Sequence, residues 1–211
     1  VLVVIGENIP QLNYLSVLLG DKPALDPNTQ FYHRLLSNDS ASAVEQIEAE
    51  LETGSIKTAS DQIVLPALRL AALDQRRGRV SADQLKELHE TRDDVTDAIP
   101  GTSATVLTPE SKAVSDMANP NRFDAIIVPA RGNIDTMAGE YVAAALAKAG
   151  LVRCLALTEA SGMMAMAAVR AEMDQGRVGA IVLSTVGGMD GRHLRFLAKR
   201  AAREFPGTPI M

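Results

Sequence analysis

The sequence predicts an α/β protein in which a bundle of helices precedes a parallel β-sheet that is covered by helices on both faces. From Asp26 to Ile99, apolar residues recur at helical spacing between capping residues and glycines. From Phe123 onward, near-continuous apolar runs alternate with helical stretches. That alternation is typical of a parallel sheet buried on both sides, so the second half is expected to be Rossmann-like, of the flavodoxin-like kind.

The same change in the spacing of apolar residues divides the chain into four predicted parts. Residues 1–25 are expected to form a juxtamembrane segment, 26–99 the helical bundle and 100–122 a linker rich in Pro, Asn, Ser and Thr. Residues 123–211 are expected to form the Rossmann-like domain, truncated at its C-terminal end, where Thr208-Pro-Ile-Met211 resembles the start of a strand.

The first helices of the bundle are predicted from an apolar stripe and a capping motif. Phe31, Tyr32, Leu35 and Leu36 form the stripe. Ser42-Ala-Val-Glu45 fits a capping box, which would begin the second helix there, and Gly54 is placed to end it.

Two further helices follow. In the third helix, Pro66 either introduces a kink or lies in the first turn, because proline lacks the N–H that a helix interior needs. Gly78 ends this helix, and Ser81-Ala-Asp-Gln84 is a second capping box that predicts the start of a fourth.

The second half is predicted as three strands and three helices. Each strand is an apolar run and each helix ends near a glycine or proline. The predicted strands are Phe123–Pro129, Arg153–Leu157 and Ala180–Leu183, and the predicted helices are Thr136–Ala149, Met163–Gln175 and Gly191–Phe205.

Composition excludes several classes of protein. A net charge of −5 and only 3% aromatic residues argue against a nucleic-acid partner, which rewards a basic surface and stacking side chains. The single cysteine, Cys154, excludes an intramolecular disulfide and is expected to be a small buried residue within a strand.

A ligand site is expected where the strands end, because ligands of such sheets bind beyond the carboxyl ends of the strands. Three loops lie there, at 130–135, 158–162 and 184–191. Asp135 and Asp190 are predicted helix N-caps, although short connections use glycine and small polar residues without any ligand. The candidate ligand-binding residues are Arg131, Gly132, Asn133, Asp135, Ser161, Gly162, Ser184, Thr185, Gly187 and Gly188.

Signals for catalysis or for a metal are weak. The three histidines, His33, His89 and His193, have no cysteine or histidine partner at ligand spacing, so no metal site is predicted. Ser161 lacks the flanking glycines of a nucleophile elbow. No phosphate-binding or dinucleotide fingerprint occurs, and no enzymatic activity or cofactor is expected.

The last predicted helix is basic on one side. Its cations are Arg192, Arg195, Lys199, Arg200 and Arg203. Such a face is usually solvated, but beside a membrane it would attract anionic headgroups.

The order of a helical bundle and a Rossmann-like sheet resembles the cobalamin-binding modules of methionine synthase and corrinoid proteins. Leu35-Leu-Ser-Asn-Asp39, Arg77-Gly-Arg-Val-Ser81 and Val64-Leu-Pro-Ala-Leu68 are similar to the helical cap of that family. Ala143–Gly150 and Val182-Leu-Ser-Thr-Val186 are similar to its first Rossmann helix and a later strand end.

The chain departs from that family at the cofactor. The cobalt-ligating histidine of the family's Asp-x-His-x-x-Gly loop falls on Asp135, within Asn133-Ile-Asp-Thr-Met-Ala138. A carboxylate substitutes poorly for imidazole in such a site. The resemblance therefore implies the scaffold without its ligand chemistry.

A second resemblance is to the cytosolic C-terminal extension of permeases of the autoinducer-2 exporter family. It rests on Pro10-Gln-Leu-Asn-Tyr-Leu-Ser-Val-Leu-Leu-Gly-Asp21, Phe31-Tyr-His-Arg-Leu-Leu36 and Val64-Leu-Pro-Ala-Leu-Arg-Leu-Ala71. It implies that Val1–Gly6 is the inner end of a membrane helix and that the domain lies at the cytoplasmic face of the inner membrane.

Together these features predict a non-enzymatic regulatory, ligand-sensing or interaction domain of a permease. The expected partners are the membrane domain of the same polypeptide, a small anionic ligand and further copies of the chain. The alternative is a soluble carrier of cobalamin or another corrinoid.

Overall fold

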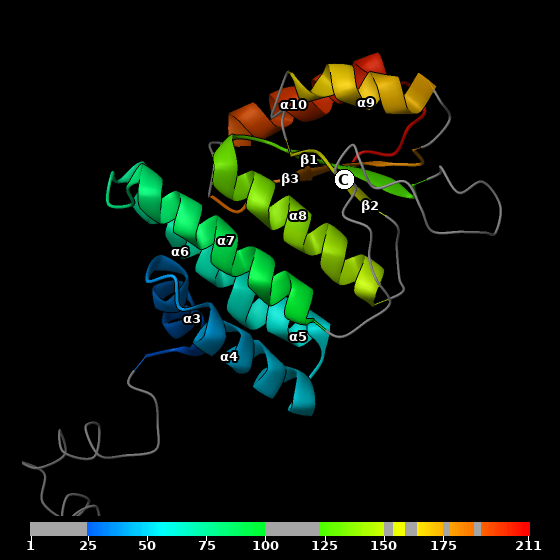
Figure 1. The fold of residues 1–211 in the computed structure, drawn as a ribbon. Coiled ribbons are helices and arrows are strands. Elements are labelled where there is room, and N and C mark those ends of the chain that lie inside the picture. Colours follow the sequence, from blue (N-terminus) through cyan, green and yellow to red (C-terminus); the bar gives the residue numbers. More distant parts are fainter. Residues whose placement is uncertain (1–24, 100–122, 150–153, 159–163, 175–177, 188–190) are drawn as a thin grey trace, which may run out of the picture.

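The computed structural model describes residues 25–99, 123–149, 154–158, 164–174, 178–187 and 191–211 (Figure 1). The elements follow one another as a run of helices and then an alternation of strands and helices. They are α3 (Pro27–Leu36), α4 (Ser40–Thr53), α5 (Ile56–Ala59), the π-helix η2 (Ser60–Val64), α6 (Leu65–Arg76), α7 (Ala82–Ala98), β1 (Ala125–Pro129), α8 (Gly132–Lys148), β2 (Cys154–Ala156), α9 (Ala165–Asp174), β3 (Ile181–Ser184) and α10 (Gly191–Glu204). The predicted juxtamembrane segment and linker lie outside the described residues, apart from Leu25.

The sheet is parallel, in the order β2-β1-β3. Ile126 of β1 is in register with Leu155 on one side and with Ile181 on the other. Beyond β3, Ile210 forms a parallel bridge with Ile181, so the predicted last strand begins beside β3. The predicted α/β, Rossmann-like fold class is confirmed. Cys154, expected to be buried, is only half-buried, because β2 lies at the edge of the sheet formed by the described residues.

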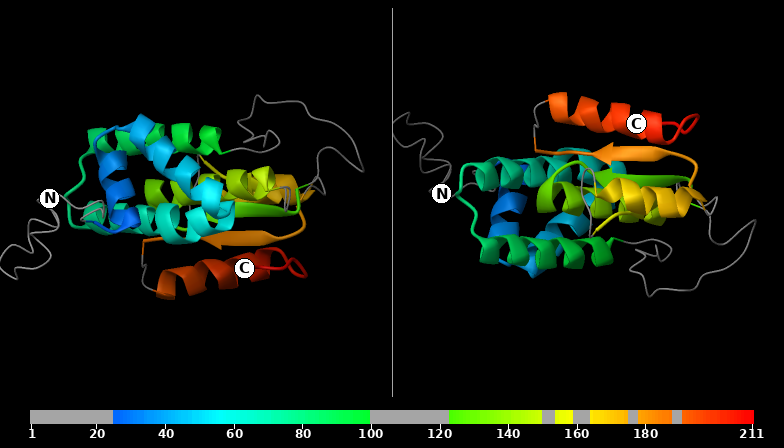
Figure 2. Two further views of the ribbon diagram at one scale, coloured as in Figure 1. Left: turned by 90° about the horizontal axis from the view of Figure 1, so that it is seen from below. Right: turned by 90° about the horizontal axis from the view of Figure 1, so that it is seen from above.

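The molecule is built in layers, with the sheet between two sets of helices. α8 covers one face of the sheet and separates it from the bundle, whereas α9 and α10 cover the other face (Figure 1). Seen from above, α9 and α10 lie on the near side and the bundle lies behind the sheet (Figure 2). The predicted helices on both faces are therefore present.

One apolar core joins the bundle to α8. Buried residues of α3, α4, α6 and α7 form a single cluster with Ile134, Met137 and Tyr141 of α8. A second cluster, on the other face of the sheet, packs Val169 of α9 and Ala201 of α10 against the strands. Helix α8 thus packs on the sheet with one side and on the bundle with the other.

Local capping explains where the helices begin. The capping box at Ser81 is confirmed, since Gln84 N donates to Ser81 Oγ at 3.1 Å and Ser81 N donates to Gln84 Oε1 at 3.0 Å. The predicted box at Ser42 is wrong. α4 begins at Ser40 because Asp39 is the N-cap and accepts a hydrogen bond from Ser42 N.

The helix that contains Pro66 is continuous but not uniform. Pro66 lies in the first turn of α6, which confirms one of the two predicted alternatives. It follows the π-helical residues of η2. Leu65 N donates to the carbonyl of Ser60, five residues back, instead of the usual four. Because proline has no N–H to donate, the wider turn accommodates it without ending the helix.

Candidate functional site

The candidate site lies at the carboxyl ends of β1 and β3. The chain leaves β1 toward α8 on one face of the sheet, and it leaves β3 toward α10 on the other face (Figure 1). Adjacent parallel strands whose connections diverge in this way form a topological switch point, where ligands of open α/β sheets bind. The residues around this point are therefore the candidate ligand-binding residues.

Asp135 holds the two sides of the switch point together. Its Oδ2 accepts the backbone N–H of Arg131 at 3.0 Å, at the end of β1. Its Oδ1 accepts the backbone N–H of Val186 at 2.9 Å, in the loop after β3. In addition, Ser184 Oγ donates to the backbone carbonyl of Asp135 at 3.3 Å. One side chain thus ties the start of α8 to the loop after β3.

The expected role of Asp135 as a helix N-cap is wrong. α8 begins at Gly132 rather than at Thr136, and Arg131 is its N-cap residue. Asp135 therefore lies within the first turns and reaches back to the N–H of Arg131. Gly132 has φ +75°, a conformation that favours glycine and lets the chain turn into the helix directly after β1. Most of the predicted loop 130–135 is consequently helix.

Burial governs the electrostatics of Asp135, which is only 4% exposed. Burial raises the pKa of its carboxyl, and hydrogen bonds from the backbone N–H groups of Val186, Arg131 and Gly187 hold back part of that rise. The Thr185 hydroxyl lies close enough to lower this pKa as well. Its Oγ1 is nevertheless buried without a hydrogen bond of normal geometry among the described residues.

The helical bundle reaches the same point through α6. A Cβ placed on Gly187 would lie 3.3 Å from the Cβ of Ala72 and 3.6 Å from an Nη atom of Arg76. The side chains of Arg76 and Arg131 are both exposed. The backbone N–H of Arg131 donates to Asp135. The backbone N–H of Gly187, the residue that lies near Arg76, donates to Asp135 as well. Two cations, one from each half of the chain, therefore border the loops that Asp135 joins.

The structure brings together much of the predicted site. Asp135, Ser184, Thr185 and Gly187 lie around the junction of β1 and β3. Arg131 and the exposed Gly132 and Asn133 form the start of α8. The other predicted residues, Ser161, Gly162 and Gly188, and the predicted N-cap Asp190, lie outside the described residues.

No family model matches the chain. No curated protein matches it significantly either. A solved structure with some likeness is the methanol:cobalamin methyltransferase complex MtaBC from Methanosarcina barkeri, at 11% sequence identity and a TM-score of 0.35. That likeness covers 98% of this chain and 78% of the other. The comparisons give no support to the resemblance with the exporter family.

The residues at the switch point do not fit a corrinoid with a protein-derived nitrogen ligand. The position that the cobalamin-module resemblance assigns to the cobalt-ligating histidine is Asp135, and both of its oxygens are engaged by backbone N–H groups. Within the described residues, no group of three or more His, Cys, Asp or Glu is arranged to hold a metal ion.

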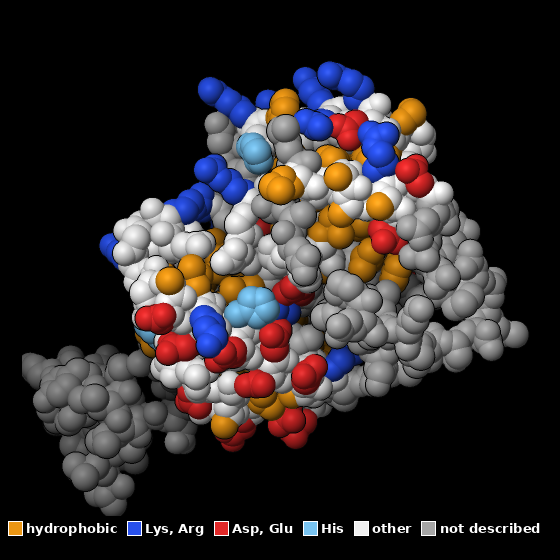
Figure 3. All heavy atoms as spheres, turned by 45° about the horizontal axis from the view of Figure 1, so that its top comes forward, with side chains coloured by type: hydrophobic (Ala, Val, Ile, Leu, Met, Phe, Trp, Pro, Cys, Tyr) orange, Lys and Arg blue, Asp and Glu red, His pale blue; other side chains and the backbone are white. Residues whose placement is uncertain are grey.

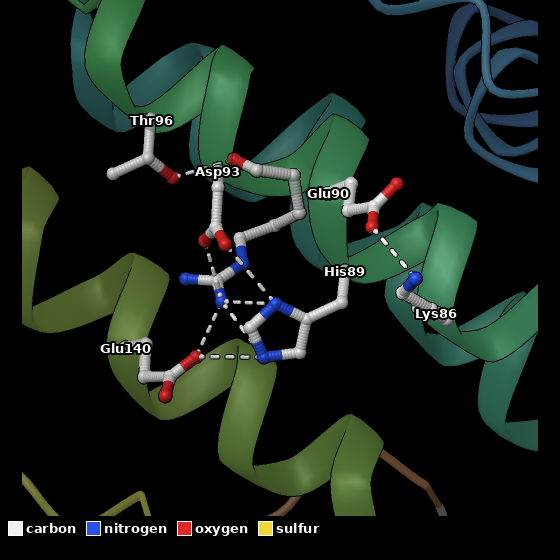
Figure 4. A network of polar contacts seen from close by, with 7 residues as sticks. Lys86, His89, Glu90, Asp93, Thr96 and Glu140 are labelled. Atoms are coloured by element: carbon white, nitrogen blue, oxygen red, sulfur yellow. Dashed lines mark hydrogen bonds and ion pairs between the residues drawn. The ribbon is translucent and has the colours of Figure 1, made fainter.

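Sequence reasoning missed a polar cluster where α7 meets α8 (Figure 4). Arg92, 4% exposed, forms an ion pair and hydrogen bond with Glu140, 6% exposed. Another nitrogen–oxygen pair, Arg92 Nη2 and Asp93 Oδ1, lies at 2.8 Å, and His89 Nδ1 lies 3.1 Å from Asp93 Oδ2. The available signal was Glu140 itself, a charged residue within the otherwise apolar stretch of α8.

This cluster is structural rather than part of the switch point. Arg92 and Glu140 link the bundle to the Rossmann-like half, and the Nε of Arg92 is buried without a partner among the described residues. Lys148 of α8 makes a second link, since its Nζ donates to the carbonyls of Thr96, Asp97 and Ile99 at the end of α7. The two halves are thus joined by polar contacts as well as by the shared apolar core.

Proposed function

We propose that this chain is a non-enzymatic sensing module that binds a small anion at the switch point and transmits binding to the helical bundle. The observation that carries the proposal is the meeting of three segments at one place. Asp135 joins the first turns of α8 to the loop after β3, and α6 packs on that loop at Gly187. A ligand there would contact both halves of the chain.

The chemistry of the site favours an anion. Arg76 and Arg131 supply two exposed guanidinium groups, which bind carboxylates and phosphates through paired N–H donors. The N-terminus of α8 begins at the same place, and helix N-termini favour negative charge. The negative charge of Asp135 is already satisfied by backbone donors, so it opposes an incoming anion less than a free carboxylate would.

The same hydrogen bonds favour binding over catalysis. A general acid or base must reach the proton that it transfers. Both oxygens of Asp135 accept backbone N–H groups and the side chain is almost entirely buried. Among the described residues near the switch point, no histidine or cysteine takes part in the contacts around Asp135.

Coupling to the bundle requires a ligand that prefers one arrangement of α6 and α8 over another. An anion held by Arg76 and Arg131 would cross-link the two helices and favour their present packing.

Attachment to a permease, and a place at the cytoplasmic face of the inner membrane, remain predictions from the exporter-family resemblance. In the described part of the chain, no helix combines the length and apolar character needed to cross a bilayer.

The test is thermal unfolding of the chain with a panel of anions: inorganic phosphate, nucleoside monophosphates and diphosphates, and dicarboxylates. Hydroxocobalamin, which is not an anion, is added separately to test the corrinoid alternative. A ligand at 100 times its Kd stabilises the folded state by about 2.7 kcal/mol, which raises Tm by roughly 5–10 °C. Arg76→Ala and Arg131→Ala should each remove most of that shift. Arg77→Ala removes a neighbouring cation that pairs with Asp74, and it should retain the shift.

Three results would reject the proposal. One is a panel in which no anion raises Tm. Another is a rise that survives both Arg76→Ala and Arg131→Ala. The last is stabilisation by hydroxocobalamin alone, with a bound red chromophore, which would favour the corrinoid carrier instead.

A further inference from the structure

Helix α10 presents a row of cations to solvent. Arg192, Arg195, Lys199 and Arg203 are exposed and recur at spacings of three and four residues, so they share one side of the helix. The opposite side carries Leu197 and Ala201, which are fully buried. The helix is therefore anchored to the sheet by its apolar side and directs its cations outward.

The one acidic residue of α10 does not weaken this charge much. Glu204 is held by Arg200 of the same helix, with 2.5 Å between Nε and Oε1. It is also held by Arg170 of α9, with 3.3 Å between Nη2 and Oε2. The guanidinium of Arg170 lies over the ring of Phe205, 5.6 Å from its centroid. The acid is thus neutralised from both helices, and the outer row remains cationic.

A large apolar side chain lies among these cations. Phe196, 51% exposed, falls between Arg192 and Lys199 on the outer side of α10. Together the outer row of α10 and Phe196 form what we call the α10 face. An exposed phenylalanine surrounded by Lys and Arg is typical of surfaces that lie at a membrane interface.

The remainder of the molecule carries the opposite charge. Residues 26–99 contain 14 Asp and Glu against 8 Lys and Arg, whereas α10 contains five Arg and Lys against one Glu. Lys and Arg gather at the end formed by α9 and α10, and most of the visible Asp and Glu lie over the bundle (Figure 3). An anionic plane would therefore attract the α10 face and repel the bundle, which fixes one orientation.

We propose that the α10 face docks on an anionic lipid surface, with Phe196 entering the headgroup region and the cations contacting lipid phosphates. A membrane fits better than a nucleic acid, because the cations lie on one exposed helix around a single phenylalanine and the net charge of the chain is −5. The acidic bundle of a second copy is the competing occupant. The inference is independent of the anion site at the switch point.

The test is sedimentation of the full chain with vesicles of phosphatidylcholine alone or mixed with phosphatidylglycerol. Binding should require the anionic lipid and should weaken as salt is added, because salt screens exposed charges. Removing two of the cations, in Arg195→Gln with Lys199→Gln, should weaken binding at least about 25-fold, since each cation near such a surface contributes about fivefold. Phe196→Ser should weaken it by about five- to tenfold.

The matched control removes the same charge from the bundle. Lys57 and Lys86 have side chains that are 84% and 80% exposed, and Lys57→Gln with Lys86→Gln should leave vesicle binding within about twofold of the wild type or slightly stronger. Each variant retains residues 1–24, so any contribution from that segment is common to all. Unchanged circular dichroism and Tm would show that the variants remain folded.

Three results would overturn the proposal. Binding to neutral vesicles as strong as to anionic ones would exclude charge as the cause. Equal losses in the α10 variant and the bundle variant would exclude the α10 face as the site. Absence of vesicle binding, together with self-association in analytical ultracentrifugation that the α10 variant abolishes, would assign the face to a second copy.

Discussion

The carboxylate of Asp135 accepts the backbone N–H of Val186 at 2.9 Å, although 51 residues separate them in the chain. The hydrogen bond connects the first turns of α8 with the loop after β3, on the two sides of the switch point. Since the second oxygen accepts the N–H of Arg131, the side chain leaves neither oxygen free. The position is consequently one where shape and hydrogen-bonding character are both constrained.

Asp135→Asn should destabilise the fold by about 1–3 kcal/mol, because the amide NH2 must face a backbone N–H and leaves a buried donor without an acceptor. Chemical denaturation measures the free energy of unfolding. Asn133→Ala is the matched control, since Asn133 is exposed in the same turn, and it should change that energy by less than about 0.5 kcal/mol. Equal effects of the two variants would contradict the assigned role.

Glu140→Gln should cost about 3 kcal/mol, because it removes the buried counter-charge of Arg92 and leaves only the pair with the half-exposed Asp93. The double variant Arg92→Met with Glu140→Leu should regain most of that loss, since an apolar pair avoids the desolvation of two charges. Both values come from denaturant unfolding. A double variant as unstable as Glu140→Gln would show that the ion pair itself, rather than its desolvation balance, stabilises the interface.

Lys148→Met should destabilise the protein by about 1.5–3 kcal/mol, because three carbonyls at the end of α7 lose a charged donor. Lys148→Arg should retain part of the effect, as guanidinium also donates to carbonyls. Amide hydrogen exchange should show the last turn of α7 opening more readily in the methionine variant than in the arginine variant. Unchanged hydrogen exchange in that turn would show that Lys148 does not stabilise the end of α7.

Stability should depend on pH through His89. The hydrogen bond with Asp93 raises the pKa of His89 above 6.5, although burial and the charge of Arg92 oppose the rise, while Asp93 and Glu140 support it electrostatically. A raised folded-state pKa contributes stability that is fully present below 6.5 and is lost as pH rises through the folded value. The free energy of unfolding should therefore fall as the pH rises from 6.5 through the raised folded-state pKa of His89.

The partner supplies the control for this pH dependence. Burial raises the pKa of Asp93, but the hydrogen bond with His89 and the charge of Arg92 outweigh it and lower the pKa overall. Asp93→Asn and His89→Gln should each flatten the slope of stability against pH. The double variant should have the same slope as either single variant. Additive effects of the two substitutions on the slope would show that the pH dependence does not arise from the His89–Asp93 pair.

Several elements could be predicted because their determinants are local. The apolar run of β1, the capping box at Ser81 and the end of the third helix at Gly78 depend on neighbouring residues only. The start of α8 was predicted one turn late because Arg131, Gly132 and Asn133 are also residue types that suit a loop. The predicted capping box at Ser42 was wrong because Asp39, three residues earlier, is the N-cap of the helix.

The site was only partly predictable because its decisive contacts are distant in sequence. The position of Asp135 beyond β1 was visible, but its bond to Val186 depends on which strand neighbours β1. Packing of Ala72 on Gly187 depends on where the bundle lies against α8, and helical periodicity shows which side is apolar without showing what covers it. The pair Arg92 and Glu140 depends on the same packing.

The apolar cluster shared by the bundle and α8 has a consequence for the covalent chain. Because Ile134, Met137 and Tyr141 pack with the bundle, the two halves are held by contacts that do not depend on the peptide link between them. A protease cut between residues 100 and 122 should therefore leave two fragments that migrate as one particle until they are denatured. Separately expressed, the bundle would present an uncovered apolar surface, and mixing with its other half should restore solubility.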